Sequence, residues 1–350
     1  MAAPGIIRSL SRRDPAVVEV LRNWRRLTGG SRVPDSDRPT VIACSGGADS
    51  SALALALACA KVRARLIIAH VVHDLRPVSE SLADRDAARR LAEHLDLPFA
   101  ETAVEVRSQP GNREATARRE RYRALAAIAR HHSCGAVVTA HHADDQLETM
   151  LMRLLRGGGA AGLAGMRDAR ELARGLTLIR PMLGITRADC RRLCTSAGWE
   201  WCEDLTNRDT GRVRAAIRHN VLPALERIRP DAAQRASSAA RLLRDASDVI
   251  NDLARAVVAR AKPTESGDGL TWDRRALRQD PAVVLGEVIR AATLRVAGRR
   301  GADRLGQREI LAAVRSIQGS GDAPKTFAWS NVSLEVSARN VRLTRSANGC

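Results

Sequence analysis

The chain has 350 residues, of which 45% are hydrophobic and 27% are charged, and its formal net charge is +18. This length allows two or three domains, and the hydrophobic fraction excludes a disordered chain. No apolar run is long enough to cross a bilayer, and the N-terminal stretch lacks the apolar core of a signal peptide. We therefore expect a globular, cytoplasmic protein with no membrane partner.

The positive charge is almost entirely arginine, because only three of the 57 basic residues are lysines. A basic globular protein commonly meets a polyanion, and nucleic acid is the commonest one. An arginine-rich composition throughout the genome would produce the same charge without such a partner, so composition leaves both interpretations open. Aromatic residues make up 2% of the chain, which argues against an extended stacking platform for single strands.

The cysteines predict neither a disulfide framework nor a zinc site. There are seven of them, an odd number, and no two form a C-x-x-C pair. We expect most of them to be small buried apolar residues.

Hydrophobic patterning predicts alternating strands and helices after a short amphipathic helix at 14–28. Continuous apolar runs are typical of parallel strands buried on both faces, and helical stretches separate them. This order predicts a doubly wound parallel α/β sheet of the Rossmann-like kind. The expected strands are 40–44, 65–72, 98–106 and 135–140, the expected helices are 49–61, 79–95, 112–132 and 144–156, and a further βα unit is expected at 176–197.

The pattern changes after about residue 215, where one long helix with a polar face is expected. A Pro/Gly/Ser-rich break at 263–269 follows, then two or three helices, and the alternation within 325–345 predicts a terminal β-hairpin. We therefore expect a small α+β C-terminal domain. The predicted regions are an N-terminal helical extension at 1–38, a catalytic domain at 39–225, a helical linker at 226–262 and the C-terminal domain at 263–350.

The stretch "TVIACSGGADSSALALALA", Thr40 to Ala58, predicts a phosphate site between a strand and a helix. Glycines let the turn direct its N–H groups toward an anion, and the helix N-terminus adds its dipole. A Walker loop would need G-K-S/T, which is missing, so the turn suits a pyrophosphate that leaves as a unit. Asp49 would repel phosphates unless Mg²⁺ lay between them, so we predict Asp49 as a metal ligand. The predicted loop residues are Ser45, Gly46, Gly47, Ala48, Asp49 and Ser50.

An Asp-capped glycine turn would explain the glycines of this stretch but not both serines. The S-G-G-x-D-S pattern after a buried strand resembles the loop of the PP-loop ATP pyrophosphatases. These enzymes adenylate a substrate oxygen, release pyrophosphate and let a nucleophile displace AMP.

Later stretches narrow the resemblance to the tRNA(Ile)-lysidine synthetase family, and together they cover residues 40–225. They resemble that family's H-V-D-H-G-L-R, N-x-E-x-x-A-R-x-x-R-Y and A-H-H-x-D-D-x-x-E-T signatures. The stretches are "HVVHDLRP" (70–77), "GNREATARRERYRAL" (111–125), "TAHHADDQLETMLMRLLRGGGAAGLAGM" (139–166), "RPML" (180–183) and "EDLTNRD…RAAIRHNVLP" (203–223).

The resemblance implies that ATP, with Mg²⁺, adenylates C2 of the wobble cytidine in the CAU-anticodon isoleucine tRNA. Free L-lysine then displaces AMP and forms lysidine, and no protein partner is implied. The predicted catalytic residues are Asp49, Asp145, Glu148, Arg118 and Arg214. Nucleotide binding is predicted for the Ser45–Ser50 loop with His70 and Arg76, and substrate binding for Asn112, Glu114, Arg121, His141 and Asp144.

The spacing of the acidic residues near Asp144 also suggests roles for them without any family resemblance. Asp145 and Glu148 lie three residues apart, so they share one face of a helix that begins at the end of a strand. There they could hold Mg²⁺, bind the ammonium group of an amino acid, or act as the base that deprotonates it. Asp144 could equally complement the helix dipole. A zinc site is an alternative, although adjacent residues rarely chelate one ion well. Its ligands would come from His141, His142, Asp144 and Asp145, together with His70, His73 and Asp74.

Two positions depart from the family pattern. Val72 and Asp74 replace the usual Asp and Gly, and Ala215 stands where asparagine is usual. Asp74 could take over the missing carboxylate from its neighbouring position. Arg118 and Arg121 lie three apart on one helix and could hold an adenylate phosphate or an RNA phosphate.

Two alternative functions stay open. A tRNA thiolation enzyme shares the loop but uses a cysteine pair or a C-x-x-C motif, neither of which is present. A non-catalytic RNA-binding relative would retain the fold, and only turnover would exclude it.

Overall fold

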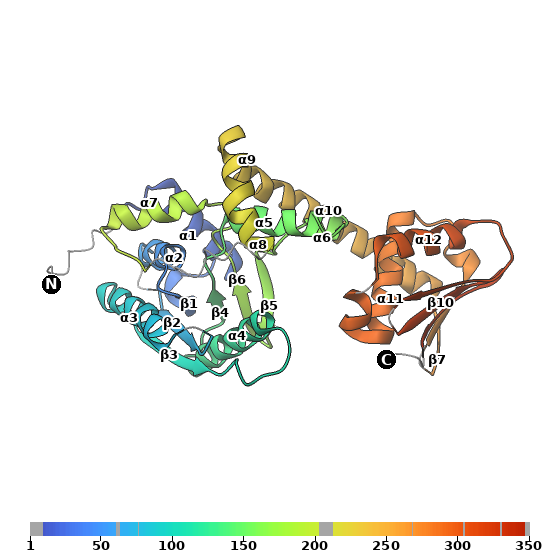
Figure 1. Cartoon of the computed structure of the whole chain (residues 1–350), viewed down its shortest axis with the longest axis horizontal. Helices are drawn as coiled ribbons and strands as arrows, with labels where there is room; N and C mark the ends of the chain where they lie inside the picture. The colour runs from blue at the N-terminus through green and yellow to red at the C-terminus, as the bar shows by residue number, and fades with distance from the viewer. Residues whose placement is uncertain are drawn as a thin grey trace. The chain divides into compact units, whose positions relative to one another are not determined.

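A computed structural model describes residues 10–60, 64–75, 77–202, 213–267, 269–303, 305–329 and 331–346 (Figure 1). The chain forms two compact units. The first is built from the described parts of Met1–Met152 and Gly165–Ala240, and the second from those of Arg153–Ala164 and Arg241–Cys350. No helix in the described ranges has the length and apolar character needed to cross a membrane.

The first unit contains a six-stranded sheet in the order β3-β2-β1-β4-β6-β5. Neighbouring strands are parallel except for β5, which runs antiparallel to β6 at the edge. The predicted α/β fold class is thus confirmed. The strands are β1 (Thr40–Ala43), β2 (Leu66–His73), β3 (Phe99–Val104), β4 (Ala136–Val138), β5 (Ala169–Ala173) and β6 (Leu176–Ile179).

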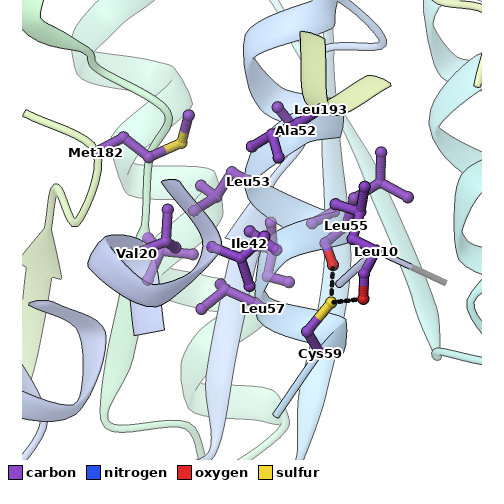
Figure 2. Packing of buried hydrophobic residues seen from close by; sticks show 14 of the residues in the cluster. Leu10, Val20, Ile42, Ala52, Leu53, Leu55, Leu57, Cys59, Met182 and Leu193 are labelled. Carbon is purple, nitrogen blue, oxygen red and sulfur yellow. Dashed lines mark hydrogen bonds between the residues drawn. The ribbon is translucent and has the colours of Figure 1, made fainter. Parts of the chain in front are cut away.

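Helices cover both faces of this sheet because successive strand residues point in opposite directions. Ile42 packs in one cluster with residues of α1, α2, α3 and α7, whereas Val41 packs on the other face with α4. Figure 2 shows the first cluster, with Ile42 of β1 facing Leu53 and Leu57 of α2. The helices of this unit are α1 (Pro15–Leu27), η1 (Asp35–Asp37), α2 (Ala48–Ala58), α3 (Val78–His94), α4 (Arg113–His131), α5 (Ala143–Leu154), α7 (Arg187–Ala197), α8 (Val213–Ala216), η3 (Ile217–Val221) and α9 (Leu222–Ile228).

The β5 strand was not predicted from the sequence. Its residues, "ARELA", are half exposed and show no strong apolar alternation, as an edge strand with one neighbour allows. The predicted βα unit at 176–197 corresponds to β6 followed by α7.

The second unit packs helices on an antiparallel sheet of five strands, in the order β7-β8-β11-β10-β9. Val288 of α11 and Val314 of α12 are buried in one cluster with Leu334 and Leu343 of the sheet. The strands are β7 (Thr264–Ser266), β8 (Gly269–Asp273), β9 (Lys325–Trp329), β10 (Val332–Val336) and β11 (Asn340–Arg345). The helices are α6 (Ala160–Leu163), the second part of α10 (Ala232–Ala261), η4 (Arg274–Ala276), α11 (Ala282–Asp303) and α12 (Gln307–Gln318).

The prediction of a two-stranded terminal hairpin was wrong, because the structure has more strands in this region. Residues 325–345 form three strands, and residues 264–266, expected to belong to a break, form β7. The polar and glycine residues around β7 resemble a linker in sequence, but antiparallel pairing with β8 satisfies their backbone groups. The domain boundaries expected at 38, 225 and 262 stay predictions.

A buried arginine holds several parts of the second unit together. The guanidinium of Arg274, which is only 5% exposed, donates to the carbonyl oxygens of five residues. Three of these acceptors lie at the end of α12, where a cation also complements the helix dipole. The acceptors are Ile317 (3.1 Å), Gly321 (2.9 Å), Ser337 (3.1 Å), Ser316 (2.8 Å) and Gly319 (2.6 Å).

Replacing Arg274 by leucine is expected to destabilise the second unit by about 3 kcal/mol, because buried carbonyl groups would lose their donors. Hydrogen exchange of the full chain should show faster exchange in α12 and β11. Arg275→Leu is the matched control, because the neighbouring Arg275 side chain is exposed. Equal exchange rates in the two variants would contradict this role.

Candidate active site

The predicted pyrophosphate loop connects β1 to α2 at the carboxyl edge of the sheet. Gly46 has a φ of +84°, and a Cβ atom there would lie 2.7 Å from the backbone oxygen of Asp84, so only glycine fits. The Ser50 hydroxyl donates to the Gly47 carbonyl (3.0 Å) and accepts from the Ser45 N–H (3.1 Å). Gly47 places no side-chain cap on α2, so the first N–H groups of that helix suit an anion.

A cleft of about 350 Å³ lies beside this loop and includes residues from the ends of β1, β2 and β4. It brings together side chains from distant parts of the chain that the sequence had singled out. Those lining it are Ser45, Asp49, Ser50, His70, Arg118, Arg121, His141, Asp145 and Arg214. Three of the other predicted residues belong to the loop itself: Gly46, Gly47 and Ala48. Four do not line the cleft: Asn112, Glu114, Asp144 and Glu148. The last, Arg76, lies outside the described residues.

His142, which the sequence assigned to no preferred role, lies at the centre of three carboxylates. Its Nε2 atom is 3.4 Å from Asp49 and 3.6 Å from Asp145, and its Nδ1 atom is 3.3 Å from Asp144. Burial alone would lower the pKa of His142, but the carboxylates outweigh it and raise the pKa to about 10. Nδ1 also lies 3.4 Å from the amide nitrogen of Asp145. A charged ring cannot accept that hydrogen, so Nδ1 donates to Asp144 instead.

The charge on His142 predicts a specific pH dependence of stability. The folded-state pKa lies above the ordinary value of about 6.5, so the stabilisation is complete below that pH and is lost as the pH rises through about 10. The unsubstituted chain should therefore have a larger free energy of unfolding than His142→Asn at low pH, and this difference should decrease as the pH rises from about 6.5 to about 10. Urea unfolding of both proteins in the same buffers measures it, and a constant difference would contradict the prediction.

Glu148 and two arginines form a buried network next to the cleft. The Glu148 side chain is 0% exposed and accepts from Arg214 Nε (2.9 Å) and from Arg218 Nε (2.5 Å) and Nη2 (3.0 Å). Both arginines also approach Asp145 Oδ1, at 3.5 and 3.3 Å. Glu148 therefore contacts Arg214, which lines the cleft, but does not line the cleft itself. Arg218 is a further member of this network, and the sequence predicted no role for it.

Asp145 and His141 are the titratable groups of α5 and its preceding loop that face the cleft. Burial would raise the pKa of Asp145, but His142, His141 and Arg214 lower it to about 2. Burial lowers the pKa of His141 to about 3, and its Nδ1 atom lies 2.9 Å from the Thr139 hydroxyl. At neutral pH the site therefore holds an ionised Asp145 and a neutral His141. Neither pKa is near that of an efficient general base.

Helix α4 contributes arginines to the cleft and is capped by a predicted substrate residue. Asn112 Oδ1 accepts from the backbone N–H groups of Glu114 (3.0 Å) and Ala115 (3.1 Å), so Asn112 is the N-cap of α4. Glu114 is exposed in the first helical turn. Arg118 and Arg121 are further along the helix, and both line the cleft.

The remaining predicted residues have distinct positions. The Nδ1 atom of His70 is 2.8 Å from the Cys44 carbonyl oxygen, so Nδ1 carries the proton and donates to that oxygen. Burial lowers the pKa of His70, so its ring is neutral and Nε2 is an acceptor. Asp144 accepts from the N–H of Arg187 (2.8 Å) at the start of α7. Asp74 accepts from the N–H groups of Val106 (2.8 Å) and Arg107 and does not line the cleft, so it does not replace the missing family carboxylate there.

The geometry disfavours the zinc alternative and fits Mg²⁺. In the described ranges no three His, Cys, Asp or Glu side chains are placed to hold a metal ion together, His141, His142 and their acidic neighbours included. Mg²⁺ in nucleotide sites uses one or two carboxylates with phosphates and water. The Asp49 side chain is 34% exposed beside the loop, so its carboxylate can reach an ion held mainly by phosphate oxygens.

Comparison with known proteins shows the general class of protein to which this chain belongs. Residues 20–225 match the PP-loop domain family, which covers more than half of the chain. The U34-tRNA thiolase NcsA from Methanococcus maripaludis has a similar fold, with a TM-score of 0.52, 17% identity, and coverage of 66% of this chain and 80% of that one. The match and the Ser45–Ser50 loop together define a PP-loop ATP-binding protein.

Individual relatives narrow the class to one family. The tRNA(Ile)-lysidine synthase of Methylobacterium nodulans is 36% identical over 265 residues, which are 76% of this chain and 77% of that protein. Those of Rhodopirellula baltica and Chromobacterium violaceum are 35% and 40% identical over 66% and 60% of this chain. The match spans 65% and 48% of the lengths of these two proteins. The chain belongs to the tRNA(Ile)-lysidine synthase family, which confirms the resemblance seen in its motifs.

Proposed function

We propose that this chain ligates L-lysine to C2 of the wobble cytidine of the isoleucine tRNA with a CAU anticodon, forming lysidine, AMP and pyrophosphate. The observation that carries the proposal is the cleft in which the glycine-rich loop faces Asp145, Arg214 and the arginines of α4. A loop for pyrophosphate, a site for an amino acid and a site for an anionic nucleotide are all needed for this reaction. Membership of the lysidine synthase family supports the same assignment.

The first step joins the nucleotide and the tRNA. The C2 oxygen of the cytidine attacks the α-phosphorus of ATP, and pyrophosphate leaves into the Ser45–Ser50 loop. Backbone N–H groups of the loop and the first turn of α2 stabilise its charge. Mg²⁺ bound at Asp49 would neutralise part of the charge of the leaving group. Arg118 and Arg121, which line the same cleft, stabilise anionic oxygens there.

The second step brings in free lysine. Its neutral ε-amine attacks C2, the C2–O bond breaks, AMP leaves with the oxygen, and the amine releases one proton. We place the α-ammonium of lysine against Asp145 and its α-carboxylate against Arg214, because a zwitterion needs one partner of each sign. The low pKa of Asp145 favours this binding role over that of a base.

Incorporation of labelled lysine tests the proposal. The assay uses ATP and unmodified transcripts of the CAU-anticodon isoleucine tRNA, of the methionine tRNA with the same anticodon, and of a wobble cytidine-to-uridine variant. Label on the first transcript alone is expected. Cleavage of ATP to AMP and pyrophosphate without label would point to another nucleophile, and no ATP cleavage with any transcript would favour a non-catalytic RNA-binding relative.

The cysteines argue against the thiolation alternative. Burial raises the pKa of the Cys44 thiol, and burial together with the nearby Asp49 carboxylate raises the pKa of Cys194 to about 12. Both thiols are therefore protonated near neutral pH and are poor sulfur carriers. We also infer a cytoplasmic location, where tRNA, ATP and free lysine are available together.

A further inference from the structure

Four arginines surround one tyrosine beside the cleft, and two of them, Arg118 and Arg121, also line it. The guanidinium carbons of Arg170, Arg118 and Arg121 lie 4.8, 5.1 and 5.5 Å from the centre of the Tyr122 ring. Arg180, at the end of β6, lies close enough to lower the pKa of Tyr122, as the other three do, although burial opposes the effect. Tyr122 comes from α4 and Arg170 from β5, so the cluster joins a helix to the edge of the sheet.

The positive charges of these four arginines are not balanced by neighbouring carboxylates. In the part of the chain that the structure describes, none of the four arginines forms an ion pair with a carboxylate. Tyr122 is only 7% exposed, and among the described residues no hydrogen-bond partner within normal limits is found for its hydroxyl or for Arg180 Nε. Arg180 Nη1 donates to the Arg167 carbonyl oxygen (2.7 Å), which is a neutral acceptor. Four neighbouring guanidinium groups repel one another unless an anion lies between them, so the arrangement indicates a binding site for negative charge.

The position of the cluster favours an RNA phosphate over the phosphate of the adenylate. The pyrophosphate loop follows β1, and β4 and β6 separate β1 from β5 in the sheet. Three strand spacings are about 14 Å, so Arg170 lies far from the loop along the sheet, whereas Arg118 and Arg121 line the cleft and Tyr122 packs in one cluster with Val41 of β1. An adenylate phosphate also carries one negative charge, fewer than four arginines would neutralise. Arg118 and Arg170 are exposed, so a large polyanion can reach them.

We propose that Arg118, Arg121, Arg170 and Arg180, arranged around Tyr122, form a second anion site that holds backbone phosphates of the RNA next to the modified nucleotide. The site rests on the proposed function for the identity of its ligand. It fixes the anticodon strand while the target base enters the cleft, since phosphate contacts set the position of the RNA and base contacts its identity.

Charge reversal at Arg170 tests the site with a control on the same strand pair. Arg170 pairs with Leu178 near the carboxyl end of β6, whereas Arg174 lies in the exposed turn at the other end. Filter binding of the unmodified isoleucine tRNA transcript, without ATP and at several salt concentrations, gives the affinity. Arg170→Glu should weaken binding about tenfold and reduce the salt slope by about one, and Arg174→Glu should change little. Arg170→Lys should recover most of the affinity.

The outcomes separate the possible sources of the anion. Unchanged tRNA affinity with loss of pyrophosphate exchange at saturating tRNA would assign the cluster to the adenylate and overturn the proposal. Equal weakening by Arg170→Glu and Arg174→Glu would indicate general surface charge and also overturn it. If Arg170→Glu fails to fold by circular dichroism, Arg170→Ala provides the same comparison. Failure of the proposed function would appear differently, as absence of lysine label on every tRNA with the unsubstituted chain.

Discussion

Replacing Asp49 by alanine is expected to lower tRNA-dependent exchange of pyrophosphate into ATP by about 10³-fold or more. Asp49 belongs to the loop and lines the cleft, and its partly exposed side chain can reach an ion held by the phosphates. Without it, the Mg²⁺ that we propose at this position would lose its carboxylate ligand and would stabilise the leaving pyrophosphate less. His142 also loses one of three carboxylates, which would leave its positive charge close to the nucleotide.

Two further variants show whether the loss comes from metal binding. Asp49→Asn keeps the shape of the side chain but removes its charge, and it should be nearly as inactive. Glu309→Ala removes an exposed acid from the first turn of α12 in the other unit, so it controls for the general effect of such an acid on a helix. Exchange above about one tenth of the normal rate in Asp49→Ala would contradict the metal assignment.

The sequence predicted well those parts of the site that are local in the chain. Gly46 and the two serines lie within six residues, and a glycine turn between a buried strand and a helix has few possible geometries. His141, Asp145, Arg118 and Arg214 come from three separate stretches. Their convergence was predictable only because parallel strands end at one edge of the sheet and because the motifs resemble one family.

Side-chain direction was the part that spacing could not provide. Asp145 and Glu148 share a face of α5, as predicted, yet only Asp145 lines the cleft, because Glu148 turns to Arg214 and Arg218. That choice depends on how the π-helical turn η3 packs beside α5, a contact between residues about 70 positions apart. Charge balance among distant groups is equally non-local, which is why the charge of His142 was not predicted.

The unpredicted strands have a similar explanation. Both β5 and β7 are short edge strands with exposed residues, so neither carries the apolar run that marked the central strands. Their structure comes from pairing with a neighbour. Edge strands of this kind are defined by their partners more than by their own residues.

Replacing Glu148 by glutamine is expected to lower the turnover number for lysine incorporation by about 10²-fold or more, with a loss of about 3 kcal/mol in stability. The carboxylate is fully buried and is the shared partner of Arg214 and Arg218. The glutamine oxygen could still accept a hydrogen bond from one guanidinium. Its NH2 group is a donor and would face the donor groups of the other guanidinium. The stability loss is placed at the lower end for a broken buried ion pair, since Arg214 is 39% exposed and water can solvate it.

Glu120→Gln is the matched control for Glu148→Gln. Glu120 is also a largely buried glutamate on a helix and is paired with two arginines, Arg119 and Arg123, but neither it nor these two partners line the cleft. It should lose some stability and keep its turnover number. Equal losses of turnover in both variants would mean that Glu148 matters only for folding.

A double-mutant cycle with Arg214→Ala decides whether Glu148 acts through that arginine. If Glu148 only holds Arg214 in place, most of the turnover lost in Glu148→Gln is already lost in Arg214→Ala, and adding the second substitution should cost less than about fivefold. Additive losses would instead assign Glu148 a direct role with the substrate. That result would require its side chain to leave the buried position and enter the cleft, because Asp145 and Arg214 line the cleft and Glu148 does not. The cycle therefore distinguishes a carboxylate that positions a guanidinium from one that binds lysine.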